Sequence, residues 1–290
     1  MIVTKMIGGL GNQMFQYAAG KALAVRRGTE LIIDNSIYGY DTTHGYGLSV
    51  FTLDAAVKTP AEIAAMKAGQ GAKPAITGIK GAVPPVQGLG YYKERAFSYN
   101  KQFENVGDDT YIEGFWQSER YFTSIRDIIR NEFSFRHPAA GRNLEMLNSI
   151  GSTESVSLHI RRGDYFNNWR TRLFHGVDLK AYYKKAVRLI KKLVANPSFY
   201  LFSDDPAWVR ENFKGEFEFR IVDINGGKTG HEDMRLMSRC RHNIICNSTF
   251  SWWGAWLNNN ENKTVIAPKK WFNNPFVNTR DVIPAGWVKL

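Results

Sequence analysis

Apolar runs and amphipathic stretches alternate along most of this chain. Ile2–Ile7 and Glu30–Asp34 are short, mostly apolar runs, and a helical pattern fills the interval from about Asn12 to Arg27. Short apolar runs predict buried strands, and apolar residues at a 3.6-residue period predict a helix packed on them. The chain therefore opens as strand, loop, helix and strand, which is the first unit of a doubly wound α/β layer. Further on, Tyr111–Phe115 predicts a strand and Ser118–Phe133 an amphipathic helix.

The same alternation begins again in the second half of the chain. The predicted elements there are, in order, a strand over 155–161, a helix over 178–195, a strand at Phe199–Phe202, a helix at Pro206–Phe213, a strand at Phe219–Val222, a helix over 231–239, a strand at Asn243–Cys246 and a helical stretch over 252–257. Strands that alternate with helices predict a parallel sheet with helices on both faces. We therefore expect an α/β fold with two Rossmann-like domains that face each other across a cleft, the first over residues 1–150 and the second over 151–290.

Two stretches interrupt this pattern. Residues 69–90 are rich in Gly and Pro, which predicts a long irregular connection on the surface. His137–Pro138 follows the predicted helix at Ser118–Phe133, and the residue before a proline is disfavoured in a helix. A boundary is therefore also expected near this point.

The chain is strongly basic. Lys and Arg exceed Asp and Glu by 11, and the pI is about 9.5. An excess of this size attracts anions such as nucleoside diphosphates, acidic membrane surfaces and nucleic acid. Several of the cations recur at helical spacing between Lys184 and Lys192. Such a run is typical of a solvated helix face, and a dedicated binding surface is the alternative.

Cysteine usage and the N-terminal sequence indicate the cellular compartment of the protein. Cys240 and Cys246 lie in apolar surroundings without the paired spacing of a zinc site, so neither a disulfide framework nor a structural metal is expected. Met1 leads directly into an apolar strand rather than a signal peptide, and no apolar run is long enough to span a bilayer. These features predict a cytoplasmic protein that is soluble or peripheral on the inner face of the membrane.

The clearest candidate chemistry lies where the predicted strand 155–161 ends. The sequence there is His159-Ile160-Arg161-Arg162-Gly163-Asp164-Tyr165, and open α/β sheets bind ligands at the carboxyl ends of their strands. If the strand extends through Arg161, then His159 and Arg161 point to one face and Arg162 to the other. A guanidinium group can donate two parallel hydrogen bonds to phosphate oxygens, so this face suits a diphosphate that departs as a leaving group. The alternative is structural, with an Arg–Asp pair closing the strand end over a glycine turn.

A glycine-rich loop joins the first strand to the first helix. Gly8-Gly9-Leu10-Gly11 could let a ligand approach the backbone at the positive end of that helix. Its spacing differs from the dinucleotide-binding pattern G-x-G-x-x-G, and a tight turn is the alternative.

Asp204 and Asp205 follow the strand predicted at Phe199–Phe202. A carboxylate there can accept hydrogen bonds from ribose hydroxyls or from N1 and N2 of guanine. Alternatively, Ser203 or Asp204 caps the helix that starts at Pro206. Because the two acids are adjacent, they do not form a D-x-D metal site, and we expect no metal.

Asn247, Ser248 and Thr249 follow the strand at Asn243–Cys246 and precede a helical stretch. Small hydroxyl residues and free amides at a helix start can bind phosphate oxygens, and ordinary helix capping is the alternative. The tryptophans that come next, Trp252, Trp253 and Trp256, are expected in the core rather than at a sugar-binding surface.

Four segments together resemble the α-1,2-fucosyltransferase family, glycosyltransferase family 11. They are Gly8–Ala18, His159–Tyr165, Leu201–Asp205 and Cys246–Ala255, and they occur in the family's order along nearly the whole chain. The resemblance implies a GT-B fold and transfer from GDP-fucose with inversion, without a metal or another cofactor. It also implies that Asn12 faces the donor and that Asp233 lies close to the nucleotide, although Asp233 could simply be a charge at a helix start. Gln13 is expected to be acceptor-side or structural.

We therefore expect an enzyme that transfers L-fucose from GDP-fucose to O2 of a terminal β-galactoside on an oligosaccharide or a glycolipid. Arg161 and amides near Ser248 and Thr249 would stabilise the charge that develops on the diphosphate. Asp164 would assist or orient the acceptor proton, or else lock one of the two arginines. His159 would hold the nucleotide or its phosphates.

The acceptor contacts are expected from residues 36–50 and 166–176, which include His175. Two other functions stay open. One is a fucosyltransferase of another linkage, such as α-1,6. The other is a basic protein that binds glycans or nucleic acid without catalysis, although the aromatic residues cluster in apolar motifs rather than between exposed cations, so no nucleic-acid partner is expected.

Overall fold

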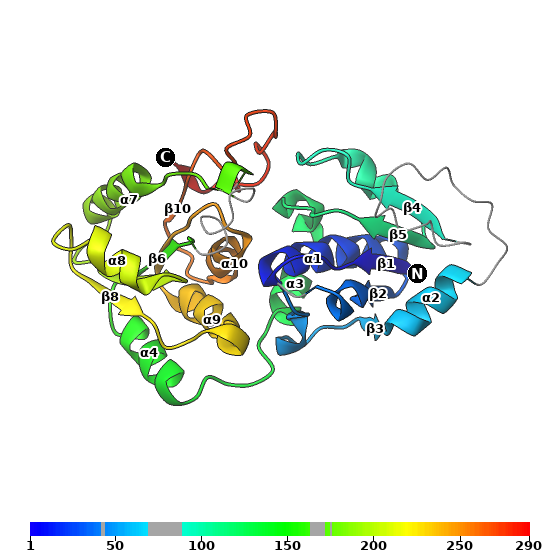
Figure 1. The fold of residues 1–290 in the computed structure, drawn as a ribbon, viewed down its shortest axis with the longest axis horizontal. Coiled ribbons are helices and arrows are strands. Elements are labelled where there is room, and N and C mark those ends of the chain that lie inside the picture. The colour runs from blue at the N-terminus through cyan, green and yellow to red at the C-terminus, as the bar shows by residue number, and fades with distance from the viewer. Residues whose placement is uncertain (42–43, 69–88, 163–171, 175) are drawn as a thin grey trace. The chain divides into compact units, whose positions relative to one another are not determined.

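Each half of the chain folds around its own parallel β-sheet (Figure 1). The computed structural model describes residues 1–41, 44–68, 89–162, 172–174 and 176–290. The chain divides into two α/β units, Met1–Arg136 (unit 1) and His137–Leu290 (unit 2). The predicted class, an α/β fold with two Rossmann-like domains, is confirmed.

Unit 1 contains a five-stranded sheet in the order β3-β2-β1-β5-β4, and every neighbouring pair is parallel. The strands are β1 (Ile2–Lys5), β2 (Leu31–Asp34), β3 (Ala56–Lys58), β4 (Gly90–Lys93) and β5 (Thr110–Glu113). The described α-helices are α1 (Leu10–Arg27), α2 (Pro60–Ala68) and α3 (Arg126–Glu132).

The helix predicted from Asn12 to Arg27 is confirmed as α1, which packs closely on the sheet. A Cβ atom at Gly20 would lie 2.9 Å from Leu31 Cδ1 and 3.2 Å from Thr4 Cβ, so any other residue here would require Leu31 and Thr4 to shift. The helix ends at Gly28, whose φ of 63° is left-handed and typical of a helix C-terminus.

The helix predicted over Ser118–Phe133 is only partly confirmed. Two short 3₁₀ turns, Glu119–Tyr121 and Thr123–Ile125, precede α3. Phe122, between them, is fully buried and lies 6.2 Å from Phe15, measured between ring centroids. The spacing therefore identified the buried face correctly, whereas packing in the core broke the helix into turns.

Unit 1 also contains elements that the sequence did not predict, namely β3, α2 and β4. Of the irregular connection predicted over 69–90, residues 69–88 lie outside the described part of the chain, and Gly90 begins β4.

Unit 2 contains a six-stranded parallel sheet in the order β11-β10-β9-β6-β7-β8. The strands are β6 (Ser155–Ile160), β7 (Ser198–Ser203), β8 (Phe219–Val222), β9 (His242–Ile244), β10 (Val265–Ala267) and β11 (Val288–Lys289). The described helices that concern the site are α4 (Gly141–Gly151), α7 (Lys180–Leu193), α8 (Pro206–Asn212), α9 (His231–Arg239) and α10 (Thr249–Leu257). Every element predicted in this half is present, and α4, β10 and β11 are additional.

Helices cover both faces of this sheet. Successive residues of a strand point to opposite faces, and in β7 Phe199 and Leu201 pack in one core with α7 and α8. Tyr200 and Phe202 pack in another core with α4 and α9. Among the described helices, none combines the length and the apolar character that crossing a bilayer requires.

The division between the units falls between Arg136 and His137, beside the predicted break at His137–Pro138, and not at 150/151. Helix α4 accounts for the difference, because Met146 and Ile150 pack in the same core as Phe202 of unit 2.

Candidate functional site

The strand order of unit 2 reverses between β6 and β9. In open α/β sheets, ligands bind beyond the carboxyl ends of the strands at such a reversal, the switch point. Residues after β6, β7 and β9 include Arg161, Asp204 and Ser248, respectively. Ile160 pairs with Ser203, so the segments that follow β6 and β7 are neighbours. The three motifs predicted in this half therefore meet at one edge of the sheet.

Two aspartates hold the two arginines. Arg161 Nη1 lies 3.2 Å from Asp204 Oδ2, and the backbone N–H of Arg162 donates to Asp204 Oδ1 over 2.8 Å. Arg162 Nε donates to Asp205 Oδ2 over 3.3 Å, and its guanidinium carbon lies 4.0 Å from the ring centre of Trp208. Arg162 is thus fixed by an ion pair and a cation–π contact. Arg161 keeps 34% of its side chain exposed, compared with 23% for Arg162, and is the more accessible of the two.

Asp205 has a structural task at the start of α8. Its Oδ1 accepts the backbone N–H of Trp208 over 3.0 Å, and Pro206 occupies the first turn. The prediction that Ser203 or Asp204 would cap this helix is wrong, since the cap is one residue further on. Ser203 instead accepts the N–H of Asp205.

His159 is more deeply buried than the period-2 argument implied. Because β6 ends at Ile160, Arg161 lies beyond the strand and the argument does not reach it. The His159 side chain is only 5% exposed, and its ring lies 5.8 Å from that of Phe250, centroid to centroid. Burial, assisted by the positive charge of Arg161, lowers the pKa of His159 to about 3. The imidazole is therefore neutral near neutral pH.

Cys246 fixes the orientation of this imidazole. Its Sγ lies 3.1 Å from His159 Nδ1 and 3.6 Å from Ser251 Oγ, across the β6–β9 switch point. Burial raises the pKa of Cys246 to about 12, so it remains a thiol. The pair therefore supplies hydrogen bonds and no charge.

The segment before α10 is well ordered by internal contacts. Asn247 is buried, and its Nδ2 donates to the carbonyl of Trp271 over 3.0 Å. Ser248 occupies the N-cap position of α10, but its side chain makes no capping hydrogen bond. Thr249 begins the helix. Ser248 and Thr249 thus lie where the helix dipole favours an anion.

The tryptophan cluster belongs to the core, as predicted. Trp252, Trp253 and Trp256 are each at most 2% exposed. The indole nitrogen of Trp252 donates to the carbonyl of Val282 over 2.8 Å, so its polar atom is satisfied within the protein.

In unit 1, the glycine-rich loop is tied to the segment over 36–50. Gln13 Nε2 donates to the carbonyls of Gly8 and Gly45, and Gln13 Oε1 accepts the N–H of Gly47. Of the two roles expected for Gln13, these contacts favour the structural one. Asn12 Oδ1 accepts a hydrogen bond of 2.9 Å from Gln117 Nε2.

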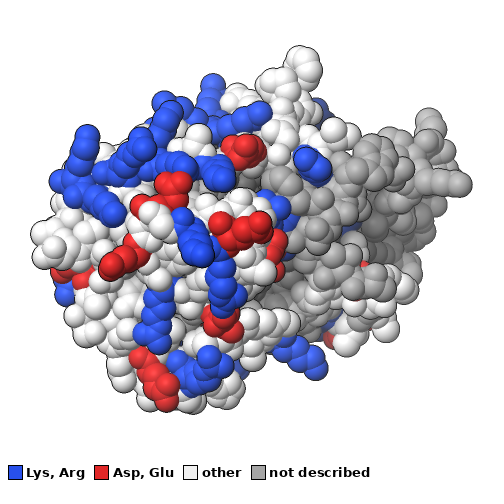
Figure 2. All heavy atoms as spheres, turned by 60° about the vertical axis from the view of Figure 1, so that its left-hand side comes forward, with Lys and Arg blue, Asp and Glu red and all other residues white. Residues whose placement is uncertain are grey.

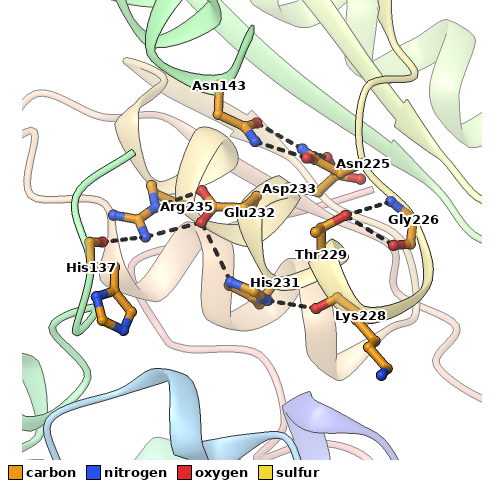
Figure 3. Close-up of polar contacts among 10 residues, drawn as sticks. All are labelled: His137, Asn143, Asn225, Gly226, Lys228, Thr229, His231, Glu232, Asp233 and Arg235. Atoms are coloured by element: carbon orange, nitrogen blue, oxygen red, sulfur yellow. Dashed lines mark hydrogen bonds and ion pairs between the residues drawn. The ribbon is translucent and has the colours of Figure 1, made fainter. Parts of the chain in front are cut away.

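The first turn of α9 is linked to neighbouring segments by a polar cluster (Figure 3). Asn225 and Asn143 exchange two hydrogen bonds of 2.9 Å, and Asn225 Nδ2 also donates to Asp233 Oδ1 over 2.8 Å. Glu232 pairs with Arg235, whose Nη2 donates to the carbonyl of His137. Burial and the charge of Glu232 raise the pKa of Asp233 to about 6. An acid held in a costly ionised state is more frequent at functional sites than elsewhere.

Several predicted residues lie outside the described part of the chain. They are Asp164 and His175, together with 166–171 of the expected acceptor segment. Arg172, Leu173 and Gly176 of that segment line an open pocket of about 630 Å³ together with Lys270 and Asn273. In the described residues no three His, Cys, Asp or Glu side chains are grouped as metal ligands.

Positive charge gathers on one side of unit 2. Figure 2 shows Lys and Arg side chains crowded over the part of the surface that carries α7. The helix has no acidic residue, and its cations are Lys180, Lys184, Lys185, Arg188, Lys191 and Lys192. Lys184 pairs with Glu216 at 2.5 Å, whereas Arg188 and Lys192 are exposed.

Comparison with known proteins places these features in a family. The model of glycosyl transferase family 11 matches residues 92–290. The chain belongs to glycosyltransferase family 11. It is 36% identical to an α-1,2-colitosyltransferase of Escherichia coli, over 100% of this chain and 99% of the relative. It is 29% identical to galactoside α-(1,2)-fucosyltransferase 1 of Ateles belzebuth, over 54% of this chain and 46% of the relative. The chain is thus a glycosyltransferase related to α-1,2-fucosyl- and α-1,2-colitosyltransferases. This relationship argues against the alternative of a basic protein that binds glycans or nucleic acid without catalysis.

Solved structures share the fold. The NodZ α-1,6-fucosyltransferase soaked with GDP-fucose superposes with a TM-score of 0.53 over 88% of this chain and 91% of its own, at 15% identity. A point mutant of Arabidopsis thaliana FUT1 in complex with GDP gives 0.50 over 91% and 69%, at 12% identity. These likenesses confirm the predicted GT-B-like fold of the family.

Sequence reasoning missed Gln117, Trp208 and Asn225. Gln117 follows the strand predicted at Tyr111–Phe115, so the rule that polar residues after strands are site candidates could have identified it. Asn225 follows the strand predicted at Phe219–Val222 and carries the same signal. Trp208 carries no comparable signal, because its contact with Arg162 joins segments that are distant in sequence.

Proposed function

We infer that the chain transfers L-fucose from GDP-fucose to O2 of a terminal β-galactoside, with inversion, and so forms an α-1,2 linkage. The observation that carries this proposal is the position of Arg161, held by Asp204 at the switch point of unit 2. A guanidinium group there, with a helix start after the neighbouring strand β9, suits a nucleoside diphosphate. The relatives named α-(1,2)-fucosyltransferases support the choice of sugar and linkage.

In the proposed reaction, the bond between fucose C1 and the diphosphate oxygen breaks and GDP leaves. Arg161 and the amides near Ser248 and Thr249 stabilise the charge on the leaving oxygen. The acceptor O2 bonds to C1 from the opposite side and releases its proton, for which Asp164 is the proposed recipient. His159, being neutral, would contribute a hydrogen bond to the donor rather than a charge.

The nucleotide would be recognised by carboxylates after β7 and at the start of α9. We assign the contact after β7 to Asp204, because Asp205 already caps α8. Asp233, with its raised pKa, is the second candidate. Asn247 and Asn12 complete the proposed donor site. The proposed reaction uses no metal, since a guanidinium group and the N-terminus of a helix stabilise the negative charge of the diphosphate.

A second donor has a specific observation in its favour. One relative that matches this chain from end to end is named as an α-1,2-colitosyltransferase. Colitose in place of fucose on the same nucleotide is therefore the alternative donor, with the linkage and the proposed residue roles unchanged.

The acceptor is proposed to be a glycolipid presented at an anionic membrane surface. The support comes from the exposed cations of α7, which lie on one helix face without acidic residues of that helix among them. Each Lys or Arg near an anionic surface contributes about 1 kcal/mol to binding. This proposal places the enzyme peripherally on the membrane.

The deciding experiment combines donors, acceptors and nucleotides. The purified protein is incubated with GDP-fucose or its colitose counterpart and a panel of β-galactosides, with and without EDTA, and the linkage of any product is determined. In parallel, thermal shifts are measured with GDP, ADP and UDP. We expect α-1,2-linked product that survives EDTA, and greater stabilisation by GDP than by ADP or UDP.

Each of three other outcomes would overturn one part of the proposed function. Equal stabilisation by the three nucleotides would remove the GDP-sugar assignment. Transfer of colitose but not of fucose would replace the donor. Loss of activity in EDTA that one metal restores would contradict the metal-free scheme.

A further inference from the structure

Unit 1 has a switch point of its own. Its strand order, β3-β2-β1-β5-β4, reverses between β1 and β5. Residues that follow these two strands include Asn12 on one side and Gln117 on the other. The rule that places the nucleotide in unit 2 therefore predicts a ligand site between these two segments as well.

The two amides at this point are in direct contact. Gln117 Nε2 donates to Asn12 Oδ1 over 2.9 Å. Gln117 is only 6% exposed, yet its Oε1 has no hydrogen-bond partner among the described residues. A buried carbonyl oxygen without a partner is unfavourable and calls for an explanation, which a bound ligand would supply.

The segment that carries Gln117 is held in a strained conformation. Trp116 has a φ of 54°, which is rare for a residue with a side chain. Glu94 fixes the backbone there, because its carboxylate accepts the N–H groups of Phe115 over 2.7 Å and of Trp116 over 3.2 Å. At Gly114, an added Cβ would lie 2.5 Å from Glu94 Cβ. Strain of this kind is characteristic of ligand sites, where it sets a side chain in one position.

The chemistry of the pair suits a sugar hydroxyl. Asn12 is half-buried and carries an Nδ2 donor, and Gln117 Oε1 is an unused acceptor. A hydroxyl group can accept from the first and donate to the second. The pair itself carries no charge, whereas the groups that suit phosphates gather at the switch point of unit 2.

We propose that Gln117 recognises the acceptor sugar: its amide nitrogen orients Asn12, and its Oε1 accepts a hydrogen bond from one hydroxyl group of the terminal galactoside. This inference rests on the proposed function and deepens it, because it assigns a residue to acceptor specificity.

The test compares wild type with Gln117→Met, which removes both hydrogen bonds at similar volume, and Gln117→Glu, which keeps an acceptor oxygen toward which Asn12 can turn its Nδ2. The exposed Gln102→Met serves as the matched control. Each protein is assayed with the parent galactoside and with a set of its monodeoxy analogues, and KM is measured separately for donor and acceptor.

For wild type, one monodeoxy analogue should react more slowly than the parent, on the order of 10- to 100-fold in kcat/KM. Gln117→Met should lose a similar factor with the parent and no longer distinguish it from that analogue. Gln117→Glu should keep the discrimination, and Gln102→Met should match wild type. A merely structural role would lower all rates alike and leave the discrimination intact.

Two results would overturn the inference: unchanged discrimination in Gln117→Met, or a rise confined to the donor KM. If wild type transfers sugar to no galactoside, the proposed function fails instead. In that case binding of the same deoxy series, followed by saturation-transfer NMR in the presence of GDP, still decides the role of Gln117.

Discussion

At the carboxyl end of β6, two residues only two positions apart have opposite surroundings. His159 is buried beside Cys246 and neutral, whereas Arg161 is partly exposed and paired with Asp204. The first can only orient a ligand, and the second can stabilise negative charge as it develops. Burial therefore decides which of these two polar residues can contribute a charge to the proposed chemistry.

Replacing Arg161 by Lys should lower kcat on the order of a hundredfold, although the charge is kept. A point ammonium group cannot reproduce the fork that a guanidinium group places on two phosphate oxygens. The exposed Arg239→Lys on α9 is the matched control and should retain the wild-type rate. Near-normal turnover in Arg161→Lys would exclude this residue from the centre of the mechanism.

Asp233 should make stability depend on pH. Its pKa is raised to about 6 by burial and by Glu232, so the folded chain binds more protons than the unfolded chain between about pH 4 and 6. The free energy of unfolding therefore falls as pH rises through this window. Asp233→Asn removes the effect and should be more stable than wild type at pH 7, by at most about 3 kcal/mol.

Urea unfolding at intervals from pH 4 to 7 measures this contribution. The difference between Asp233→Asn and wild type should grow with pH up to about 6 and then level off. The exposed Glu211→Gln on α8 should show no such trend. A difference that is constant over the whole range would mean that the ionised carboxylate is not costly in the folded protein.

At the scale of elements, the start of the short helix α8 gives two adjacent aspartates different contacts. Asp205 accepts the N–H of Trp208 and binds Arg162, whereas Asp204 makes no contact with the helix start and pairs with Arg161. The local geometry of the helix N-terminus thus engages Asp205, and Asp204, which holds Arg161 and the N–H of Arg162, is the proposed nucleotide contact.

Asp205→Ala should lower the free energy of unfolding by about 1 kcal/mol, because the N-cap is lost. Asp205→Asn retains a capping side chain and should lose much less. Neither change should alter the preference for GDP over ADP in thermal-shift measurements. Asp204→Asn should behave in the opposite way, with nearly normal stability and a reduced preference for GDP. If instead the Asp205 variants lose the preference for GDP and Asp204→Asn keeps it, the nucleotide contact belongs to Asp205.

At the scale of the whole molecule, charge is distributed unevenly. Most of the excess of Lys and Arg falls in residues 137–290, and α7 alone carries six of these cations without an acid. The buried face of the helix packs on the sheet through Tyr183, Val187 and Ile190. Its other face is therefore free to meet an anionic surface (Figure 2).

Charge reversal at Arg188 and Lys192 should weaken binding to vesicles that contain anionic phospholipid, on the order of tenfold or more. Binding of the wild type should fall in high salt, because exposed charges are screened. The matched control reverses Arg142 and Arg239, which lie on α4 and α9 at the opposite face of the sheet. Co-sedimentation is the measurement, and equal losses in both double variants would indicate a response to net charge rather than a surface on α7.

Strong local patterns determined much of this protein. The apolar runs gave the strands that form the centre of each sheet, and the helical periods gave α1, α7 and α9. The motifs with Arg161, Asp204 and Ser248 were placed correctly at strand ends, because the end of an apolar run is itself a local signal. Patterns failed for short strands such as β3, β10 and β11, which depend on neighbouring strands for their hydrogen bonds.

Only the tertiary structure decided how these pieces combine. Strand order, and hence both switch points, depends on which strands pair over long separations in the chain. The contact of Gln117 with Asn12 and the neutral state of His159 arise from the same long-range packing. The different contacts of Asp204 and Asp205 also depend on the tertiary structure, because they are set by where α8 begins to within one residue. The physical reason is common to all: hydrophobic periodicity records which face of an element is buried, but not which partner buries it.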